Sequence, residues 1–121
     1  CETVHRHDKL VVLHSCGNLA AIMDDLVECG YDGKHSYQDA IEPGIYELHR
    51  RYGDRMCILG GVDVDFLCRS DEEAIRRRVR QYIDEMGSHG YMLGSGNSIP
   101  DYVPIESYRA MLDEGLRYGR P

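Results

Sequence analysis

The sequence predicts an α/β fold with parallel strands, because short apolar runs alternate with amphipathic stretches four times along its 121 residues. We expect strands at residues 9–16, 33–40, 55–63 and 90–96. We expect helices at residues 18–30, 42–53, 70–87 and 105–119. Two architectures place four such βα units in a row: half of a (β/α)8 barrel and a small doubly wound sheet.

The first and third strands are the clearest elements. KLVVLHSC at 9–16 and RMCILGGVD at 55–63 are nearly continuous apolar runs, which is typical of parallel strands buried on both faces. GKHSYQDA at 33–40 is more polar, so the second strand depends mainly on its place in the repeating order. GYMLGSG at 90–96 completes the set.

The helices follow from apolar spacing and from capping residues. The helix at 18–30 has one apolar face and begins at Asn18, a residue type that caps helix N-termini well. The helix at 70–87 begins with Ser70 and Glu73 at the spacing of a capping box. Both patterns predict amphipathic helices that pack one face on a sheet.

Composition and charge argue against several classes of function. A hydrophobic content of 42% with 29% charged residues is typical of a globular domain, and a net charge of −7 argues against nucleic-acid binding. The arginine run at 76–78 is flanked by acidic residues and is expected on the solvated face of a helix. No apolar run approaches the ~20 residues needed to span a membrane. The five cysteines, with no export signal, predict free thiols in a cytoplasmic protein.

The chain begins with Cys1 rather than methionine. We therefore expect it to be a piece of a longer protein, in which residues 1–121 form a single partial domain.

Polar residues follow all four predicted strands, where parallel α/β folds place their chemistry. They are His14 and Cys16, then Tyr37, Gln38 and Asp39, then Asp63 and Asp65, and finally Ser95, Asn97 and Ser98. Four such groups at corresponding places predict a common pocket. His35, near the start of the second strand, is a further candidate for its lining.

His14 and Cys16 are candidate metal ligands. Residues i and i+2 of a strand point to the same side, so the imidazole and the thiolate can converge on one ion. Both groups bind zinc well, but a catalytic zinc has three protein ligands, and no third appears at a recognisable spacing. The alternative is a buried polar strand end without metal.

Glycines mark the ends of the third and fourth strands. Gly60, Gly61 and Gly96, with Ser95, are candidates for close approach to a cofactor or ligand, while tight βα turns are the alternative explanation. Neither a G-x-G-x-x-G pattern nor a P-loop is present in the sequence.

Three stretches, taken in order, resemble the C-terminal part of the uroporphyrinogen decarboxylase superfamily, which also includes cobalamin-dependent methyltransferases. They are LHSCGN, IEPGIYELHRRYGDRMCILGGVDVDFL and GYMLGSGNSIPDYVPIESYRAM, and they span nearly the whole chain. The resemblance implies a (β/α)8 TIM barrel, of which this chain is the C-terminal half with the last four βα units.

The resemblance also implies candidate roles for individual residues. In the methyltransferase branch, a His-x-Cys pair and a later cysteine hold a zinc ion that activates a thiol. His14 and Cys16 match the pair, whereas the later cysteine falls at Asn97. Decarboxylases carry a histidine in that region, which Asn97 does not match either. Asp39, Asp63 or a residue of the N-terminal half is then the expected third ligand.

Three functions follow from this resemblance. The first is methyl transfer to a zinc-bound thiol, with a corrinoid on a partner protein as methyl donor. The second is decarboxylation of a tetrapyrrole, with Asp39, Asp63 and Asn97 binding the substrate. The third is a non-catalytic half-barrel or binding module. In each case we expect the N-terminal half or a second copy to complete the barrel, and we expect neither a nucleic-acid nor a membrane partner.

Overall fold

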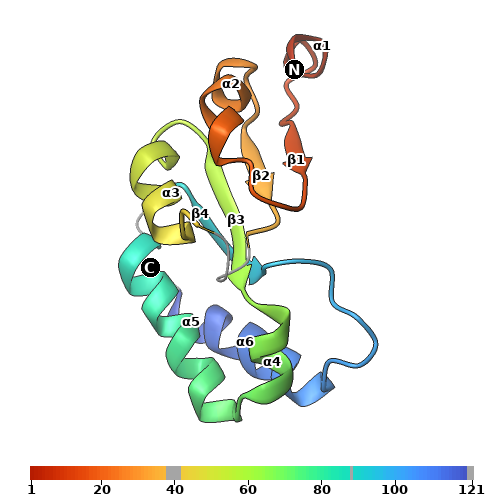
Figure 1. Ribbon diagram of the computed structural model, residues 1–121, viewed down its shortest axis with the longest axis vertical. Coiled ribbons are helices and arrows are strands. Elements are labelled where there is room, and N and C mark those ends of the chain that lie inside the picture. Colours follow the sequence, from red (N-terminus) through yellow and green to blue (C-terminus); the bar gives the residue numbers. More distant parts are fainter. Residues whose placement is uncertain (38–41, 88, 120–121) are drawn as a thin grey trace.

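The computed structural model describes residues 1–37, 42–87 and 89–119, and within them the strands form one parallel four-stranded sheet (Figure 1). The strands are β1 (Val12–His14), β2 (Gly33–His35), β3 (Cys57–Val62) and β4 (Tyr91–Ser95). They lie in the sheet in chain order, β1-β2-β3-β4, and all neighbours are parallel. A doubly wound sheet reverses its strand order at a switch point, so the barrel-type alternative is confirmed.

All four predicted helices are present in the described residues. η1 (Ala20–Ile22) and α2 (Met23–Glu28) follow β1, α3 (Ile45–Tyr52) follows β2, α5 (Glu72–Met86) follows β3, and α6 (Ile105–Tyr118) follows β4. The start of α5 was predicted one residue too early. Its N-cap is Asp71 rather than Ser70, because Asp71 Oδ1 accepts a hydrogen bond from the Ala74 amide at 2.8 Å.

Two short helices were not predicted: α1 (Glu2–His5) and α4 (Val64–Arg69). Helices of four and six residues are too short to show an apolar period, which explains why the pattern missed both. The strands are also shorter than predicted, most clearly β1 and β2, which have three residues each. Residues 38–41 of the predicted second strand lie outside the described part of the chain.

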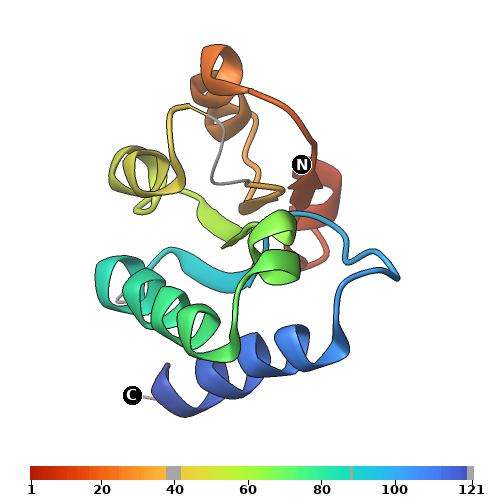
Figure 2. The same cartoon turned by 60° about the horizontal axis from the view of Figure 1, so that its bottom comes forward.

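Helices α2, α3, α5 and α6 lie along one side of the curved sheet (Figure 2). One row of paired strand residues faces them: Leu13, Lys34, Ile58 and Tyr91. Ile58 is fully buried there, among apolar side chains of α3 and α5. The next row points to the opposite side of the sheet because strand side chains alternate, and its Met92 is 58% exposed.

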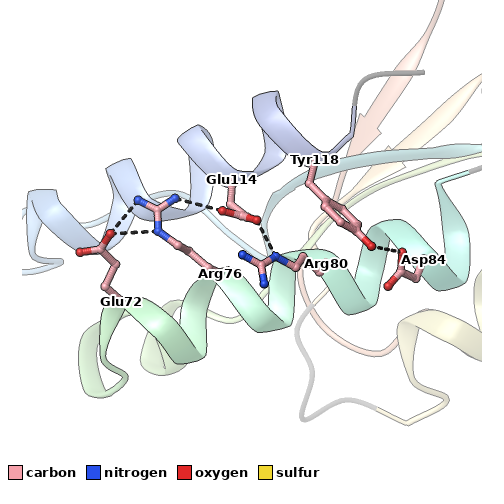
Figure 3. A network of polar contacts seen from close by, with 6 residues as sticks. All are labelled: Glu72, Arg76, Arg80, Asp84, Glu114 and Tyr118. Atoms are coloured by element: carbon pink, nitrogen blue, oxygen red, sulfur yellow. Dashed lines mark hydrogen bonds and ion pairs between the residues drawn. The ribbon is translucent and has the colours of Figure 1, made fainter.

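Helices α5 and α6 are joined by a buried carboxylate (Figure 3). Glu114 of α6, whose side chain is 5% exposed, accepts from Arg76 Nη1 at 3.1 Å and from Arg80 Nε at 2.6 Å. The hydrogen bond from Arg80 is the main cause that holds the pKa of Glu114 below its ordinary value, and Arg76 acts in the same direction. The prediction of a solvated arginine face is therefore wrong for Arg76, which bridges Glu72 and Glu114.

Among the described residues, we find no helix with the length and apolar character needed to cross a membrane.

Candidate functional site

The carboxyl ends of β1 and β2 bring two histidines into contact. His14 and His35 are paired in the register of these strands and point to the side of the sheet opposite the helices. Their Nδ1 atoms lie 2.7 Å apart, and their ring centroids are 4.9 Å apart. The pairing of two three-residue strands therefore sets the spacing of the two imidazoles.

Cys16 lies two residues beyond His14 and is surrounded by polar groups. Its sulfur is 3.7 Å from His14 Nε2 and accepts a hydrogen bond from Ser36 Oγ at 3.5 Å. The amide of Asn97 also faces the sulfur, with Nδ2 at 3.6 Å and Oδ1 at 3.9 Å. Polar groups of two other segments, Ser36 and Asn97, therefore lie against the Cys16 sulfur.

His35 extends the cluster to the end of β4. Its Nε2 lies 3.1 Å from the carbonyl oxygen of Ser95, although β3 lies between β2 and β4 in the sheet. Gly60 of β3 makes this contact possible. A Cβ atom at Gly60 would lie 2.7 Å from the Ser95 oxygen and 3.4 Å from the His35 ring, and Gly60 also has a φ of +109° that favours glycine.

The family model of uroporphyrinogen decarboxylase (URO-D) matches residues 1–118, nearly the whole chain. The chain belongs to the URO-D family. It is 35% identical over 78 residues to a uroporphyrinogen decarboxylase of Cupriavidus pinatubonensis. The matched region covers 61% of this chain and 21% of that protein.

A solved structure, a methyltransferase from Methanosarcina mazei, has the same fold, with a TM-score of 0.77 and 22% identity. The match covers 98% of this chain and 34% of that protein, so the chain spans about a third of the structure's length and about a fifth of the decarboxylase's. The predicted α/β fold and the predicted superfamily are both confirmed.

The donor atoms of this URO-D chain can be compared with the geometry of zinc. Bond lengths of ~2.3 Å to sulfur and ~2.05 Å to nitrogen, at a tetrahedral angle, separate the two ligand atoms by about 3.6 Å. His14 Nε2 and Cys16 Sγ are 3.7 Å apart, so the pair fits two corners of such a site. Within the described residues, no third His, Cys, Asp or Glu joins them in a group that can hold a metal ion.

The predicted carboxylates do not join this pair in the described residues. Asp63 caps the N-terminus of α4, where its Oδ1 accepts from the Phe66 amide at 3.0 Å. Asp39, the other predicted carboxylate, lies outside the described residues, as does Gln38. Asn97 is the one predicted substrate-binding residue that the structure places against Cys16.

The predicted glycine positions differ in their surroundings. Gly60 borders the cluster, whereas a Cβ atom at Gly61 would lie 2.7 Å from Ile45 Cδ1, on the core side. Gly96 is buried, and its amide donates to the Val62 carbonyl at 2.6 Å. Ser95 contributes its carbonyl oxygen to His35, while its hydroxyl donates to the Asn97 carbonyl at 2.6 Å.

Ser36 and Lys34 are two residues near the site that sequence reasoning missed. Lys34 is 2% exposed, donates from Nζ to the Ser36 carbonyl at 2.9 Å, and lies 3.9 Å from the centroid of the Tyr37 ring. Burial lowers the pKa of Lys34 from 10.5 to about 8, and the negative charge of Cys16 opposes this change. The signal in the sequence was weak, since Lys34 is one charged residue in a polar stretch.

Proposed function

We propose that this chain supplies part of a thiol methyltransferase site, in which His14 and Cys16 bind zinc. The observation that carries the proposal is the 3.7 Å separation of His14 Nε2 and Cys16 Sγ, which matches two corners of a zinc tetrahedron. A bound zinc lowers the pKa of an acceptor thiol and holds it as a thiolate. A corrinoid on a partner protein is the proposed methyl donor.

The other residues of the cluster support the sulfur ligand. Ser36 and Asn97 donate hydrogen bonds to Cys16, which reduces the negative charge that a ligating thiolate carries. Asn97 occupies the position where the resemblance places a cysteine, and its amide touches the sulfur of Cys16. The proposal therefore assigns Asn97 to the support of Cys16, and the third protein ligand to a residue beyond those described.

Zinc analysis tests the proposal directly. In the protein that contains this chain, after equilibration with zinc and removal of free metal, elemental analysis is expected to find about one zinc ion per site. Cys16→Ser is expected to lose it. Cys29→Ser is the matched control, because Cys29 is also an exposed free cysteine but lies away from the cluster at the end of α2. A wild-type protein that contains this chain but holds no zinc, or a Cys16→Ser variant that retains zinc, contradicts the proposal.

Decarboxylation of a tetrapyrrole is the second candidate, because the curated relative with 35% identity is a uroporphyrinogen decarboxylase. In this alternative, Asp39 and Asp63 accept hydrogen bonds from the pyrrole N–H groups, Asn97 binds the pyrrole N–H groups or the carboxylates of the substrate, and zinc plays no part. Release of carbon dioxide from a porphyrinogen by the protein that contains this chain, unchanged in Cys16→Ser, supports this candidate. Loss of methyl transfer in Cys16→Ser supports the first.

We also propose that a further protein segment covers the bare face of the sheet. Val12 and Met92, on the face opposite the helices, are 50% and 58% exposed. Exposed apolar side chains on one face of a parallel sheet indicate that other protein segments pack on that face, since parallel sheets are usually buried on both faces. The remaining barrel units or a second copy of the chain are the proposed cover, and the chain alone is expected to lack turnover. A chain that remains strictly monomeric and still turns over substrate contradicts this proposal.

A further inference from the structure

A row of ring contacts leads from the end of β4 to the sulfur of Cys16. His35 Nε2 lies 3.1 Å from the Ser95 carbonyl oxygen, His35 Nδ1 lies 2.7 Å from His14 Nδ1, and His14 Nε2 lies 3.7 Å from Cys16 Sγ. The contacts involve all four ring nitrogens of the two histidines. The partner of each nitrogen therefore constrains where the ring protons lie.

The proton positions follow from the first contact onward. A carbonyl oxygen only accepts hydrogen bonds, so His35 Nε2 carries a proton. A neutral imidazole has one N–H group, which leaves a lone pair on His35 Nδ1. Across the 2.7 Å contact the proton then belongs to His14 Nδ1. The lone pair of His14 is consequently on Nε2, the atom nearest to the Cys16 sulfur.

We propose that His35 is a positioning residue that holds His14 in its Nδ1–H tautomer and so directs the Nε2 lone pair toward the space beside Cys16. Metal-binding histidines commonly donate their second ring N–H to a neighbouring acceptor, which fixes the ring and raises its basicity. In the described part of the chain, His35 provides that acceptor for His14. The use of this lone pair as a zinc ligand depends on the proposed function, whereas the tautomer itself does not.

Nitrogen-15 NMR of the histidine rings tests the tautomer without any metal or substrate. Spectra of the metal-free chain are recorded at alkaline pH, and His14→Gln identifies the His14 signals. We expect His14 to have a protonated Nδ1 and an unprotonated Nε2, the reverse of the tautomer that free histidine prefers. A wild-type spectrum with the proton on His14 Nε2 overturns the proposal, even if no variant can be folded.

Two substitutions of His35 separate its hydrogen bond from its bulk. His35→Leu removes the acceptor, and His14 is expected to revert to the Nε2–H tautomer. His35→Asn places a side-chain oxygen near the former Nδ1 atom, and we expect it to restore the Nδ1–H tautomer. An unchanged His14 spectrum in His35→Leu contradicts a positioning role.

The zinc affinity of the same two variants is a second measure of the positioning role. We expect about 10- to 100-fold weaker zinc binding in His35→Leu and recovery in His35→Asn, as for other residues that orient a metal ligand. If the wild type binds no zinc but has the Nδ1–H tautomer, the positioning role stands and the zinc proposal fails. If zinc binds through Cys16 and His35→Leu changes neither tautomer nor affinity, the positioning role fails and the zinc proposal stands.

Discussion

Replacing Lys34 by methionine is expected to stabilise this protein. The Lys34 ammonium group is buried with one hydrogen bond, to the Ser36 carbonyl, and one contact with the Tyr37 ring. These contacts do not offset the loss of water, since burial lowers the pKa of Lys34 from 10.5 to about 8. Methionine has a similar unbranched shape and carries no charge.

The pKa change sets the size of the effect. Each pH unit between the two pKa values corresponds to about 1.4 kcal/mol, so the protonated form of Lys34 lowers the free energy of unfolding by about 3 kcal/mol near pH 7. Loss of the hydrogen bond to Ser36 costs about 1 kcal/mol in the variant. Lys34→Met is therefore expected to be about 2 kcal/mol more stable than the wild type near neutral pH.

The pH dependence gives the sharper test. Between pH about 8 and 10.5 the unfolded chain keeps the Lys34 proton and the folded chain releases it, so wild-type stability rises with pH in this window. The stability advantage of Lys34→Met is expected to shrink in this window. Above pH 10.5 the wild type is expected to be more stable than the variant by about 1 kcal/mol, because the lost hydrogen bond to Ser36 is then the remaining difference between them.

Urea unfolding at a series of pH values measures both effects. Lys9→Met is the matched control, because Lys9 is exposed and is the only other lysine in the sequence. It is expected to follow the wild-type curve at every pH. A Lys34→Met chain that is less stable than wild type at pH 7, or a difference that does not change up to pH 10.5, refutes the reasoning.

Two further substitutions probe the helix pair and the glycine beside the site. Glu114→Gln is expected to lower the free energy of unfolding by about 2 kcal/mol near pH 7, because charge-assisted hydrogen bonds to Arg76 and Arg80 weaken. The Glu114 carboxylate contributes its full stabilisation above its ordinary pKa of 4.5, and this stabilisation disappears as the pH falls through the lower pKa of the folded state. The difference between wild type and Glu114→Gln is therefore expected to vanish in acid. Urea unfolding at a series of pH values measures it, with Glu106→Gln as the exposed control. Gly60→Ala is expected to lower the free energy of unfolding by about 1–3 kcal/mol and to displace the His35 ring. Gly44→Ala is the control, because a Cβ atom at Gly44 meets nothing within 4 Å, and it is expected to have neither effect. Unfolding curves and histidine NMR spectra measure the two effects.

The architecture was predictable because it depends on patterns that repeat along the chain. The apolar runs KLVVLHSC and RMCILGGVD contain β1 and β3, and the amphipathic stretches at 70–87 and 105–119 contain α5 and α6. The ends of the elements were less predictable, because a hydrogen bond of a single side chain decides them. Asp71, adjacent to the expected cap Ser70, is an equally suitable capping residue by type, and the structure uses it.

The contact between His14 and Cys16 was predictable because the two residues are close in the sequence. His14 and Cys16 were identified as a pair because their spacing of two places both side chains on one side, and the structure brings them together. The contacts of Ser36 and Asn97 with Cys16 depend on how separate segments meet beyond the strand ends. Sequence spacing carries no information about such contacts, so Ser36 was missed.

The sheet order explains why a glycine belongs to the site although it has no side chain to contribute. His35 of β2 reaches the Ser95 carbonyl of β4 across β3, and Gly60 is the residue of β3 that this contact passes. Any Cβ atom there would crowd both groups, so the absence of a side chain at this position of β3 is what allows His35 to contact the Ser95 carbonyl. The sequence predicts that Gly60 lies beside a bound ligand, whereas the structure places it beside His35 and the Ser95 carbonyl.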